Sequence, residues 1–282
     1  MFLIIVNFAD IDFIPGRHDD FPSERYYALE ALSASGMVKL LRSAAHYREW
    51  RDHPSAPTPA MQFGTVVHGL VLEPEREIVA IAPNIERRSN ADKAVWAEFE
   101  AQLGGRIPMK QADFDRAQRV RDAVFAHTSA RALLDADGRS EVTLLWRDED
   151  YGTRNKARID RLRDDGGIVD LKTTTDVTPN AFSRKAETGQ LYVQAAHYRA
   201  GCERVQQSSS PFFAWIAVEI ESPFGVRCYS ADKHALKIGR DLAEHAAWIY
   251  AEAIRTGQWP GYPEDIVPLY LPKRARPNID IE

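Results

Sequence analysis

The chain has 282 residues, of which 44% are hydrophobic and 27% are charged, and its formal net charge is −5. This composition is typical of a globular protein with one large or two small domains, and it excludes a generally basic nucleic-acid binder, although a local basic groove could still hold DNA. Two cysteines are too few for a disulfide framework or a four-cysteine cluster, and they indicate a reducing compartment.

The beginning of the chain, residues 1–13, is apolar for a few residues and then becomes acidic. It lacks the basic start of a signal peptide and the length of a membrane span, so we expect a cytoplasmic protein with no membrane partner. A short edge strand or an ill-chosen start codon would explain this stretch equally well.

Helical periodicity dominates the N-terminal half. Apolar residues at helical spacing predict a helix over 35–50, which Ser33 or Ser35 could cap. A proline-rich turn then leads into a helix over about 65–72, which Pro74 should stop. Two further helices are expected, over 91–103 and 111–134.

The pattern changes near residue 139. Alternating and β-branched runs predict three strands with turns between them, over 141–149, 154–164 and 166–175. Two helices should follow from residue 179, with Gly189 between them and Gly201 at the end of the second. Two more strands, a long helix and an extended tail complete the prediction, over 211–220, 225–232, 232–257 and 267–282. We therefore expect one α/β domain with a helical N-terminal part and a mixed sheet, since three adjacent short strands favour a meander.

The stretch "GIVDLKTTTDV" places two charged residues inside an otherwise buried strand. Asp170 and Lys172 are two residues apart, so their side chains should share one face with Ile168, while Val169 and Leu171 occupy the other. A buried face accepts a carboxylate and an ammonium when they pair or bind something. A plain salt bridge and a metal site with a catalytic lysine both remain open.

A second acid precedes this strand. Asp160 lies in "ARIDRL", and a hairpin through "RDDGG" would bring it close to Asp170. Two neighbouring carboxylates repel each other unless one is protonated or a cation lies between them, and Mg²⁺ is the first candidate for oxygen ligands. The alternative is that Asp160 pairs with Arg158 or Arg161 on the surface while Asp170 pairs with Lys172.

These motifs resemble the PD-(D/E)XK nuclease superfamily, and within it the RecE-type exonucleases. "ARIDRL", "GGIVDLKTTT" and "QLYVQAAHYRAG" look like the catalytic core of that family. "SASGMVKLLRSAAHYREW", "FGTVVHGLVLEPE", "EVTLLW" and "GQWPGYP" are similar to its N-terminal helix, histidine motif, acid-bearing strand and closing segment. One departure is Ala45, where the family would lead us to expect proline; it lies away from the acids.

The resemblance implies a role for individual residues. It makes Lys172 the catalytic lysine, and Glu141 an acid that supports the site. It also implies that Gln194 and Tyr198 are a helical pair facing the active site. The metal ligands would be His68, Asp160, Asp170 and the Leu171 carbonyl, with Mg²⁺ as cofactor and Mn²⁺ as a substitute. On the residues alone, a histidine in an apolar helical run such as His68 is more often a core residue. Glu141 could be a solvated residue, and the helical pair could be packing residues.

The same resemblance implies a 5′→3′ exonuclease of phage or prophage recombination. It would act on double-stranded DNA ends as a homo-oligomeric ring, with a single-strand annealing protein as a further partner. The nuclease domain would cover 26–262, divided into a helical part (26–138) and a catalytic sheet core (139–262), with an N-terminal extension (1–25) and a tail (263–282). Five basic residues are candidates for DNA phosphate contacts, although helix charges are often merely solvated; they are Arg42, Arg48, Arg51, Arg184 and Lys185.

Other functions remain open on the sequence. A structure- or site-specific endonuclease could use the same core, and a non-catalytic DNA-binding module could have the same fold. The iron–sulfur nucleases of CRISPR adaptation are disfavoured because they need four cysteines, and the chain has two.

Overall fold

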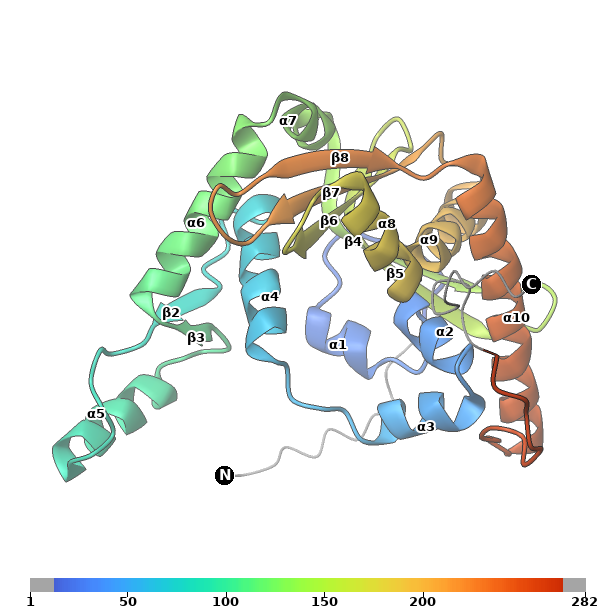
Figure 1. Ribbon diagram of the computed structural model, residues 1–282, viewed down its shortest axis with the longest axis horizontal. Helices are drawn as coiled ribbons and strands as arrows, with labels where there is room; N and C mark the ends of the chain where they lie inside the picture. Colours follow the sequence, from blue (N-terminus) through green and yellow to red (C-terminus); the bar gives the residue numbers. More distant parts are fainter. Residues whose placement is uncertain (1–12, 271–282) are drawn as a thin grey trace, which may run out of the picture.

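The computed structural model describes residues 13–270, and a six-stranded mixed sheet forms the centre of the fold (Figure 1). The strand order is β1-β4-β5-β6-β7-β8. Strands β4, β5 and β6 form an antiparallel meander, whereas β6 and β7 are parallel, as the expected mixed sheet requires. The strands are β1 (Gly16–His18), β4 (Gly138–Arg147), β5 (Arg154–Arg163), β6 (Ile168–Thr174), β7 (Phe213–Glu219) and β8 (Val226–Ser230).

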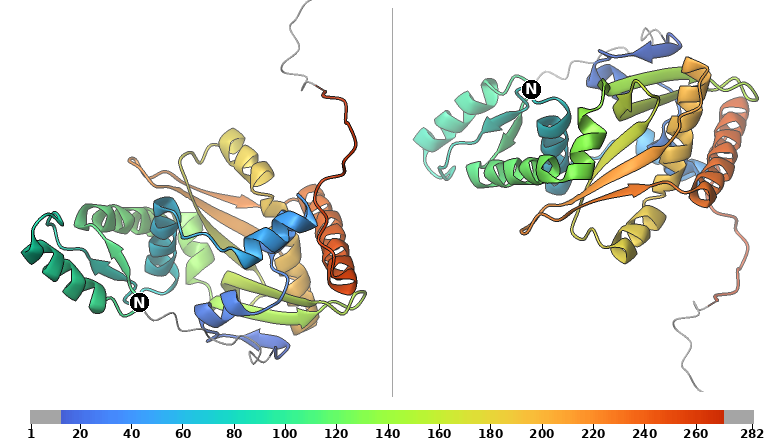
Figure 2. Two further views of the ribbon diagram at one scale, coloured as in Figure 1. Left: turned by 90° about the horizontal axis from the view of Figure 1, so that it is seen from below. Right: turned by 90° about the horizontal axis from the view of Figure 1, so that it is seen from above.

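Helices cover both faces of this sheet (Figures 1 and 2). On one face α8 (Pro179–Thr188) and α9 (Leu191–Gln206) bury a core that includes Ile168. On the other face α4 (Pro59–Leu72), α6 (Gln111–Ala126) and α7 (Thr128–Asp135) bury a core that includes Val169 and Leu171. The alternation of β6 therefore divides its apolar residues between the two cores, as the sequence predicts.

A third layer packs behind α9. The long helix α10 (Lys233–Thr256) lies against α9, together with α2 (Ala34–Leu40) and α3 (Ala44–Asp52). Gly257 ends α10 in the left-handed conformation, with φ of +70°, which glycine adopts without a steric penalty. The short helix α1 (Ser23–Ala28) packs near β4 and β5, and Lys156 of β5 donates hydrogen bonds to the carbonyls of Tyr26 and Leu29.

An arm projects from this body between α4 and α6 (Figures 1 and 2). It contains β2 (Val79–Ile81), α5 (Asn90–Ala101) and β3 (Ile107–Met109), and its two strands pair in parallel. Within the described range, none of the residues of α5 is buried. The arm is therefore held to the body mainly at its base.

Two helices that the sequence predicts as continuous are broken. The predicted helix 35–50 is split into α2 and α3, and the predicted helix 111–134 into α6 and α7. At the first break, Ser43 accepts a hydrogen bond from the His46 N–H; at the second, the His127 ring accepts one from the Ala130 N–H. Each side chain caps a new helix and so makes the break favourable.

Two predicted helix ends are also wrong. Helix α4 begins at Pro59, not near residue 65, because Thr58 caps it and proline suits the first helical position. Helix α9 continues past Gly201 to Gln206. A Cβ atom at Gly201 would lie 2.8 Å from the Trp146 ring, so this glycine allows close packing and does not end the helix.

The chain after α10 returns over α2 and α3. The Ala45 N–H donates to the Pro260 carbonyl, and Trp259 stacks on Tyr47. Residues 263–270 contain no helix or strand, as expected for the first part of the tail. The expectations for residues 1–12 and 271–282 lie outside the described residues. Over 13–270, every helix is too short or too polar to cross a bilayer.

Candidate active site

Strands β5 and β6 separate at the position where Asp160 and Asp170 face each other. The two strands pair at Arg161–Val169 and Leu162–Ile168, and in this register Asp160 lies opposite Asp170. At that point the Leu171 N–H donates to Asp160 Oδ2 at 2.8 Å. The Asp160 carboxylate thus accepts a hydrogen bond from a backbone N–H that would otherwise pair with the neighbouring strand. The hairpin brings Asp160 and Asp170 together, as the sequence predicts.

Asp170 and Lys172 share a strand face. Asp170 is 1% exposed, and its Oδ2 lies 2.6 Å from Lys172 Nζ. Its other oxygen, Oδ1, accepts a hydrogen bond of 2.8 Å from Gln194 Nε2 on α9. Among the described residues, Oδ2 receives no hydrogen bond of good angle despite the close lysine, so this buried oxygen retains capacity for a further partner.

Burial and the charges of neighbouring groups shift the pKa values of the side chains in this cluster. Burial, and then the Asp170 carboxylate, raise the pKa of Asp160 well above its usual range. Burial works to lower the pKa of Lys172, but the Asp170 and Asp160 carboxylates outweigh it and raise that pKa. The lysine is therefore a cation at neutral pH, and the acids are positioned where a further positive charge would stabilise them.

His68 reaches this cluster from α4 on the opposite side. Its Nδ1 lies 3.5 Å from Asp160 Oδ2. Burial, and then the Lys172 cation, lower the pKa of His68 to about 4. The imidazole is therefore neutral at pH 7, which is the form that coordinates metals, and the short distance to Asp160 is not an ion pair.

Glu141 lies across from Asp160 on β4. The β4–β5 pairs on either side, Ser140–Arg161 and Val142–Ile159, place Glu141 opposite Asp160, but its own φ is +56°. This left-handed backbone is strained for a residue other than glycine and turns the side chain away from ordinary strand alternation. Arg158 pairs with the Glu141 carboxylate, whose pKa burial nevertheless raises.

These side chains fit a divalent cation. Ligand atoms of His68, Glu141 and Asp160 all lie within 4.8 Å of one another, which suits a hard or borderline cation with oxygen and imidazole ligands. The set differs from the one that the resemblance implies. Glu141 joins the cluster directly, whereas Asp170 is paired with Lys172 and Gln194.

The other implied site residues line the same region. Tyr198 lies one turn after Gln194 on α9, is 8% exposed, and has a pKa raised well above its usual range, mainly by burial. Leu171 lies between the acid and the lysine; its N–H is bound to Asp160 and its side chain is in the core.

The five basic candidates have different surroundings. Arg42 donates to the Tyr262 hydroxyl, Arg48 pairs with Asp52, and Arg51 donates to the carbonyls of residues 27 and 28. Arg184 is exposed on α8. Lys185 is half-buried and donates to the Thr173 carbonyl at 2.7 Å. Lys185 is therefore the one among the five that contacts the strand of Lys172.

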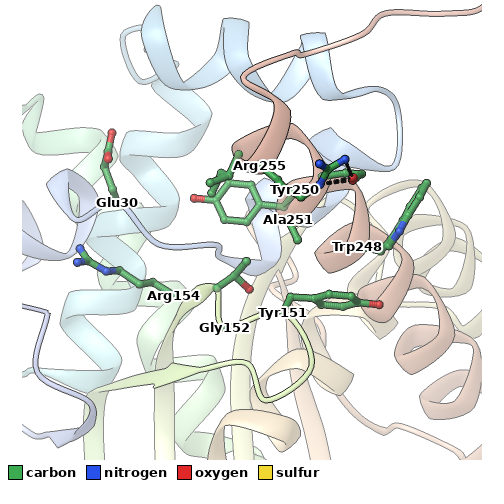
Figure 3. A pocket seen from close by; sticks show the side chains of 11 residues that line it. Glu30, Tyr151, Gly152, Arg154, Trp248, Tyr250, Ala251 and Arg255 are labelled. Atoms are coloured by element: carbon green, nitrogen blue, oxygen red, sulfur yellow. Dashed lines mark hydrogen bonds and ion pairs between the residues drawn. The ribbon is translucent and has the colours of Figure 1, made fainter.

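Of two pockets on the described surface, the larger lies away from the site. It has a volume of about 680 Å³ and lies between α10 and the β4–β5 turn, with Tyr151, Trp248 and Arg255 among its lining residues (Figure 3). Arg154, at its edge, is six residues from Asp160 along β5, roughly 20 Å away. The smaller pocket, of about 390 Å³, includes Thr173 and adjoins the site.

Arg158 is a site residue that the sequence interpretation placed only as a surface partner of Asp160. It binds Glu141 instead, and it also donates to the Phe21 carbonyl at 2.9 Å. Residues two apart on a strand share a face, so the sequence pattern already predicted that Arg158 would lie on the same face as Asp160. The pairing depends on the positive φ of Glu141, and a glutamate in the sequence does not predict such an angle.

A family model and a solved structure each match most of the chain. A family model described as "PDDEXK-like domain of unknown function (DUF3799)" matches residues 33–268. A solved structure described as a "putative exonuclease" from Eubacterium rectale superposes with a TM-score of 0.59 over 84% of this chain and 87% of that chain, at 14% identity, a likeness that shows the fold alone.

A second solved structure, SSO0001, covers 67% of this chain and 85% of that chain at 12% identity, with a TM-score of 0.29 that is too low to support an argument. No curated protein sequence matches. Since the family model spans most of the chain, this protein belongs to the PDDEXK-like family DUF3799 and has the PD-(D/E)XK nuclease fold.

Proposed function

We propose that the chain is a metal-dependent deoxyribonuclease that hydrolyses phosphodiester bonds. The observation that supports this most strongly is the convergence of Asp160, Asp170 and Lys172 where β5 and β6 separate, with His68 and Glu141 completing a cation-sized cluster. Such a group of acids beside a buried lysine suits attack on a phosphodiester, because the acids hold positive charge and the lysine faces the developing negative charge.

The side chains of the chain itself would position the reacting groups. His68, Glu141 and Asp160 would hold the cation, which supplies Lewis-acid charge beside the scissile phosphate when bound. Lys172 would orient the attacking water and stabilise negative charge on the phosphate oxygens. Gln194 holds Asp170 through Oδ1, and the Leu171 N–H holds Asp160, so neither acid has to reorganise during the reaction.

The finer proposal is a RecE-type 5′→3′ exonuclease that acts on double-stranded DNA ends in phage or prophage recombination. The sequence motifs over residues 26–262 support it, and so does the fold shared with a protein described as an exonuclease. We propose Mg²⁺ as the cofactor, with Mn²⁺ as a substitute, because both prefer the carboxylate oxygens that make up two of the three ligand groups in the cluster.

The proposal also covers the domain boundaries and the partners of the chain. We propose a single nuclease domain over 26–262, with helical and sheet parts that meet at residues 138 and 139, an N-terminal extension and a tail. The partners would be a homo-oligomeric ring of identical chains and a single-strand annealing protein, in the cytoplasm. Mass measurement in solution tests the ring, which fails if the protein is a monomer at the concentrations that cleave DNA.

Digestion of linear and covalently closed circular DNA tests the activity. With Mg²⁺ the linear DNA should be degraded and the circle left intact, and EDTA should stop the reaction. Release of label from 5′-labelled but not 3′-labelled ends at early times would support the polarity. Nicking of circles would replace the exonuclease with an endonuclease, and binding without any hydrolysis would replace it with a DNA-binding module.

A further inference from the structure

A short N-terminal segment, residues 21–29, lies against strand β5 (Figure 2). We propose that Arg158 of β5 is a positioning residue, which fixes the Glu141 carboxylate for the cation while the Phe21 carbonyl anchors Arg158 itself. This inference rests on the proposed metal-dependent function. It gives a role in the site to a part of the chain that precedes the family match over 33–268.

The Arg158 guanidinium joins the carboxylate to the N-terminal segment. Its Nε donates to Glu141 Oε2, and its Nη1 donates to the Phe21 carbonyl at 2.9 Å. The ion pair is shielded from water, because the Arg158 side chain is 14% exposed and that of Glu141 is 19% exposed. Since the donors of a guanidinium have a fixed planar geometry, the carbonyl on one side determines where the carboxylate lies on the other.

Glu141 depends on such a partner because its backbone departs from strand geometry. Its φ of +56° is unfavourable for a residue other than glycine and turns its side chain out of the usual alternation. Burial raises the pKa of Glu141, whereas Arg158 works to lower it and so favours the charged form. Arg158 donates to Oε2, so Oε1 can serve a cation together with His68 and Asp160.

The anchor is firm because the segment is bound to β5 at further points. Lys156, two residues before Arg158, donates to the carbonyls of Tyr26 and Leu29 at 2.6 and 2.8 Å. The Tyr26 ring lies over both cations, 4.8 Å from Lys156 Nζ and 6.0 Å from Arg158 Cζ. The Phe21 carbonyl therefore belongs to a segment that is fixed on the strand, and it can hold the guanidinium in place.

Removal of Arg158 distinguishes positioning from plain electrostatics, because the two effects have opposite signs. Loss of a cation beside a cation site removes a repulsion and should tighten metal binding. Loss of a residue that orients a ligand should weaken metal binding, typically by about 10- to 100-fold. The direction of the change in metal affinity therefore decides between them.

The measurement is the dissociation constant for Mn²⁺, followed by electron paramagnetic resonance without DNA. Arg158→Gln should weaken binding at least about tenfold. Arg158→Lys should also weaken it, because a lysine keeps the charge but lacks the two fixed donors. Arg161→Gln is the matched control on β5. Its side chain donates to Ser140 and to the Ala136 carbonyl, and its loss should leave the affinity unchanged or slightly tighter.

Two further variants test the route from the segment to the cation. In a Glu141→Gln background, Arg158→Gln should cause no additional weakening, because it acts through that carboxylate. Phe21→Ala should loosen the anchor, since the Phe21 side chain is buried against Tyr26 and Leu145, and should weaken Mn²⁺ binding in wild type but not in Arg158→Gln. Melting curves check that each variant folds.

The outcomes separate this inference from the proposed function. Mn²⁺ binding by Arg158→Gln that equals or exceeds that of wild type overturns the positioning role and leaves the nuclease proposal standing. An unchanged affinity in Phe21→Ala refutes the anchoring by the N-terminal segment. Absence of Mn²⁺ binding in wild type overturns both proposals. If the affinities change as expected but linear DNA is not hydrolysed, the nuclease proposal fails and the positioning role stands.

Discussion

At the scale of single residues, Asp170 combines a buried position with two different partners. Lys172 contacts one of its oxygens and Gln194 the other. Asp170→Asn preserves the shape and the amide contact but removes the negative charge. We expect hydrolysis to fall by at least about 100-fold, the usual cost of losing one electrostatic contributor in an active site, and Lys172→Gln to cause a similar loss.

The stability of Asp170→Asn separates a catalytic role from a structural one. Without metal, Asp170 raises the pKa of Asp160, so its neutralisation relieves repulsion. The melting temperature in EDTA should therefore stay constant or rise. Asp165→Asn, in the exposed turn of the same hairpin, should keep full activity. A sharp fall in melting temperature for Asp170→Asn would identify the Asp170–Lys172 contact as a structural salt bridge.

His197 is a buried histidine outside the candidate site. It is 3% exposed, its Nε2 lies 3.1 Å from the Lys156 carbonyl, and burial lowers its pKa to about 4. Between about pH 4 and the usual value of about 6.5, the unfolded chain binds a proton that the folded chain does not. His197 thus contributes stability that is complete above about pH 6.5 and is lost as the pH falls towards 4, of the order of 3 kcal/mol in total.

Urea unfolding at several pH values tests this contribution. His197→Gln keeps a donor for the carbonyl but does not titrate, so its unfolding free energy should depend less on pH between 4 and 6.5 than that of wild type. His245→Gln, at an exposed position on α10, should follow wild type. The comparison is needed because the raised pKa values of Asp160 and Glu141 change stability in the opposite direction. Equal pH slopes for wild type and His197→Gln would refute the assignment.

At the scale of elements, the β4–β5 hairpin contains two glycines with positive φ and different surroundings. Gly138 has φ of +156°, and a Cβ atom there would lie 2.4 Å from the Leu162 carbonyl oxygen. Gly152, in the turn, has φ of +67° and open space around it. Gly152→Ala should cost about 1–2 kcal/mol for its conformation alone, and Gly138→Ala should cost at least about 3 kcal/mol because the backbone must also move.

Equilibrium unfolding of the two variants provides the comparison, with each serving as the control for the other. Equal losses of stability would show that the backbone conformation dominates and that the close approach of β4 to β5 at Gly138 is relaxed in solution.

Elements with one consistent pattern are predictable from the sequence. The alternation of β6 and the periodicity of α10 both match the structure, including the end of α10 at Gly257. The breaks at Ser43 and His127 are missed because apolar periodicity continues across them, whereas a single side-chain cap decides the local conformation. The early start of α4 is missed because its first turn is exposed and carries no apolar pattern.

The candidate site is predictable to a similar extent. Strand parity and a short hairpin are local, and they suffice to bring Asp160, Asp170 and Lys172 together. The approach of His68 depends on packing of α4 against a distant strand, so only a family resemblance anticipates it. The direct place of Glu141 in the cluster depends on a left-handed backbone angle that no residue pattern encodes.

At the scale of the whole molecule, the proposed function requires a chain of net charge −5 to hold a polyanion. The acids of the site repel phosphate until a cation is bound, and a bound cation makes the local electrostatic potential positive. Ca²⁺ should therefore tighten binding of a short blunt duplex relative to EDTA. Monovalent salt should weaken binding with a modest slope, because so acidic a chain can neutralise few phosphates.

Titrations of wild type and Asp160→Ala at several salt concentrations test this coupling. The variant should lose most of the response to Ca²⁺ while keeping the salt dependence, because the flanking basic residues are unchanged. If Asp160→Ala responds to Ca²⁺ as wild type does, Asp160 is not a ligand and the metal-site proposal fails.

The arm between α4 and α6 has a consequence for how such proteins diversify. Its two short strands pair in parallel, Val79 with Ile107 and Ile81 with Met109, so the points at which the chain leaves and rejoins the body are about 10 Å apart. Within the described range, α5 buries none of its residues. Insertions, deletions or exchange of the segment 82–106 would leave the sheet and its acids in place. We therefore expect lineages that share this catalytic core to differ in length and sequence most freely there, and to gain new binding partners by changing the arm while the chemistry stays the same.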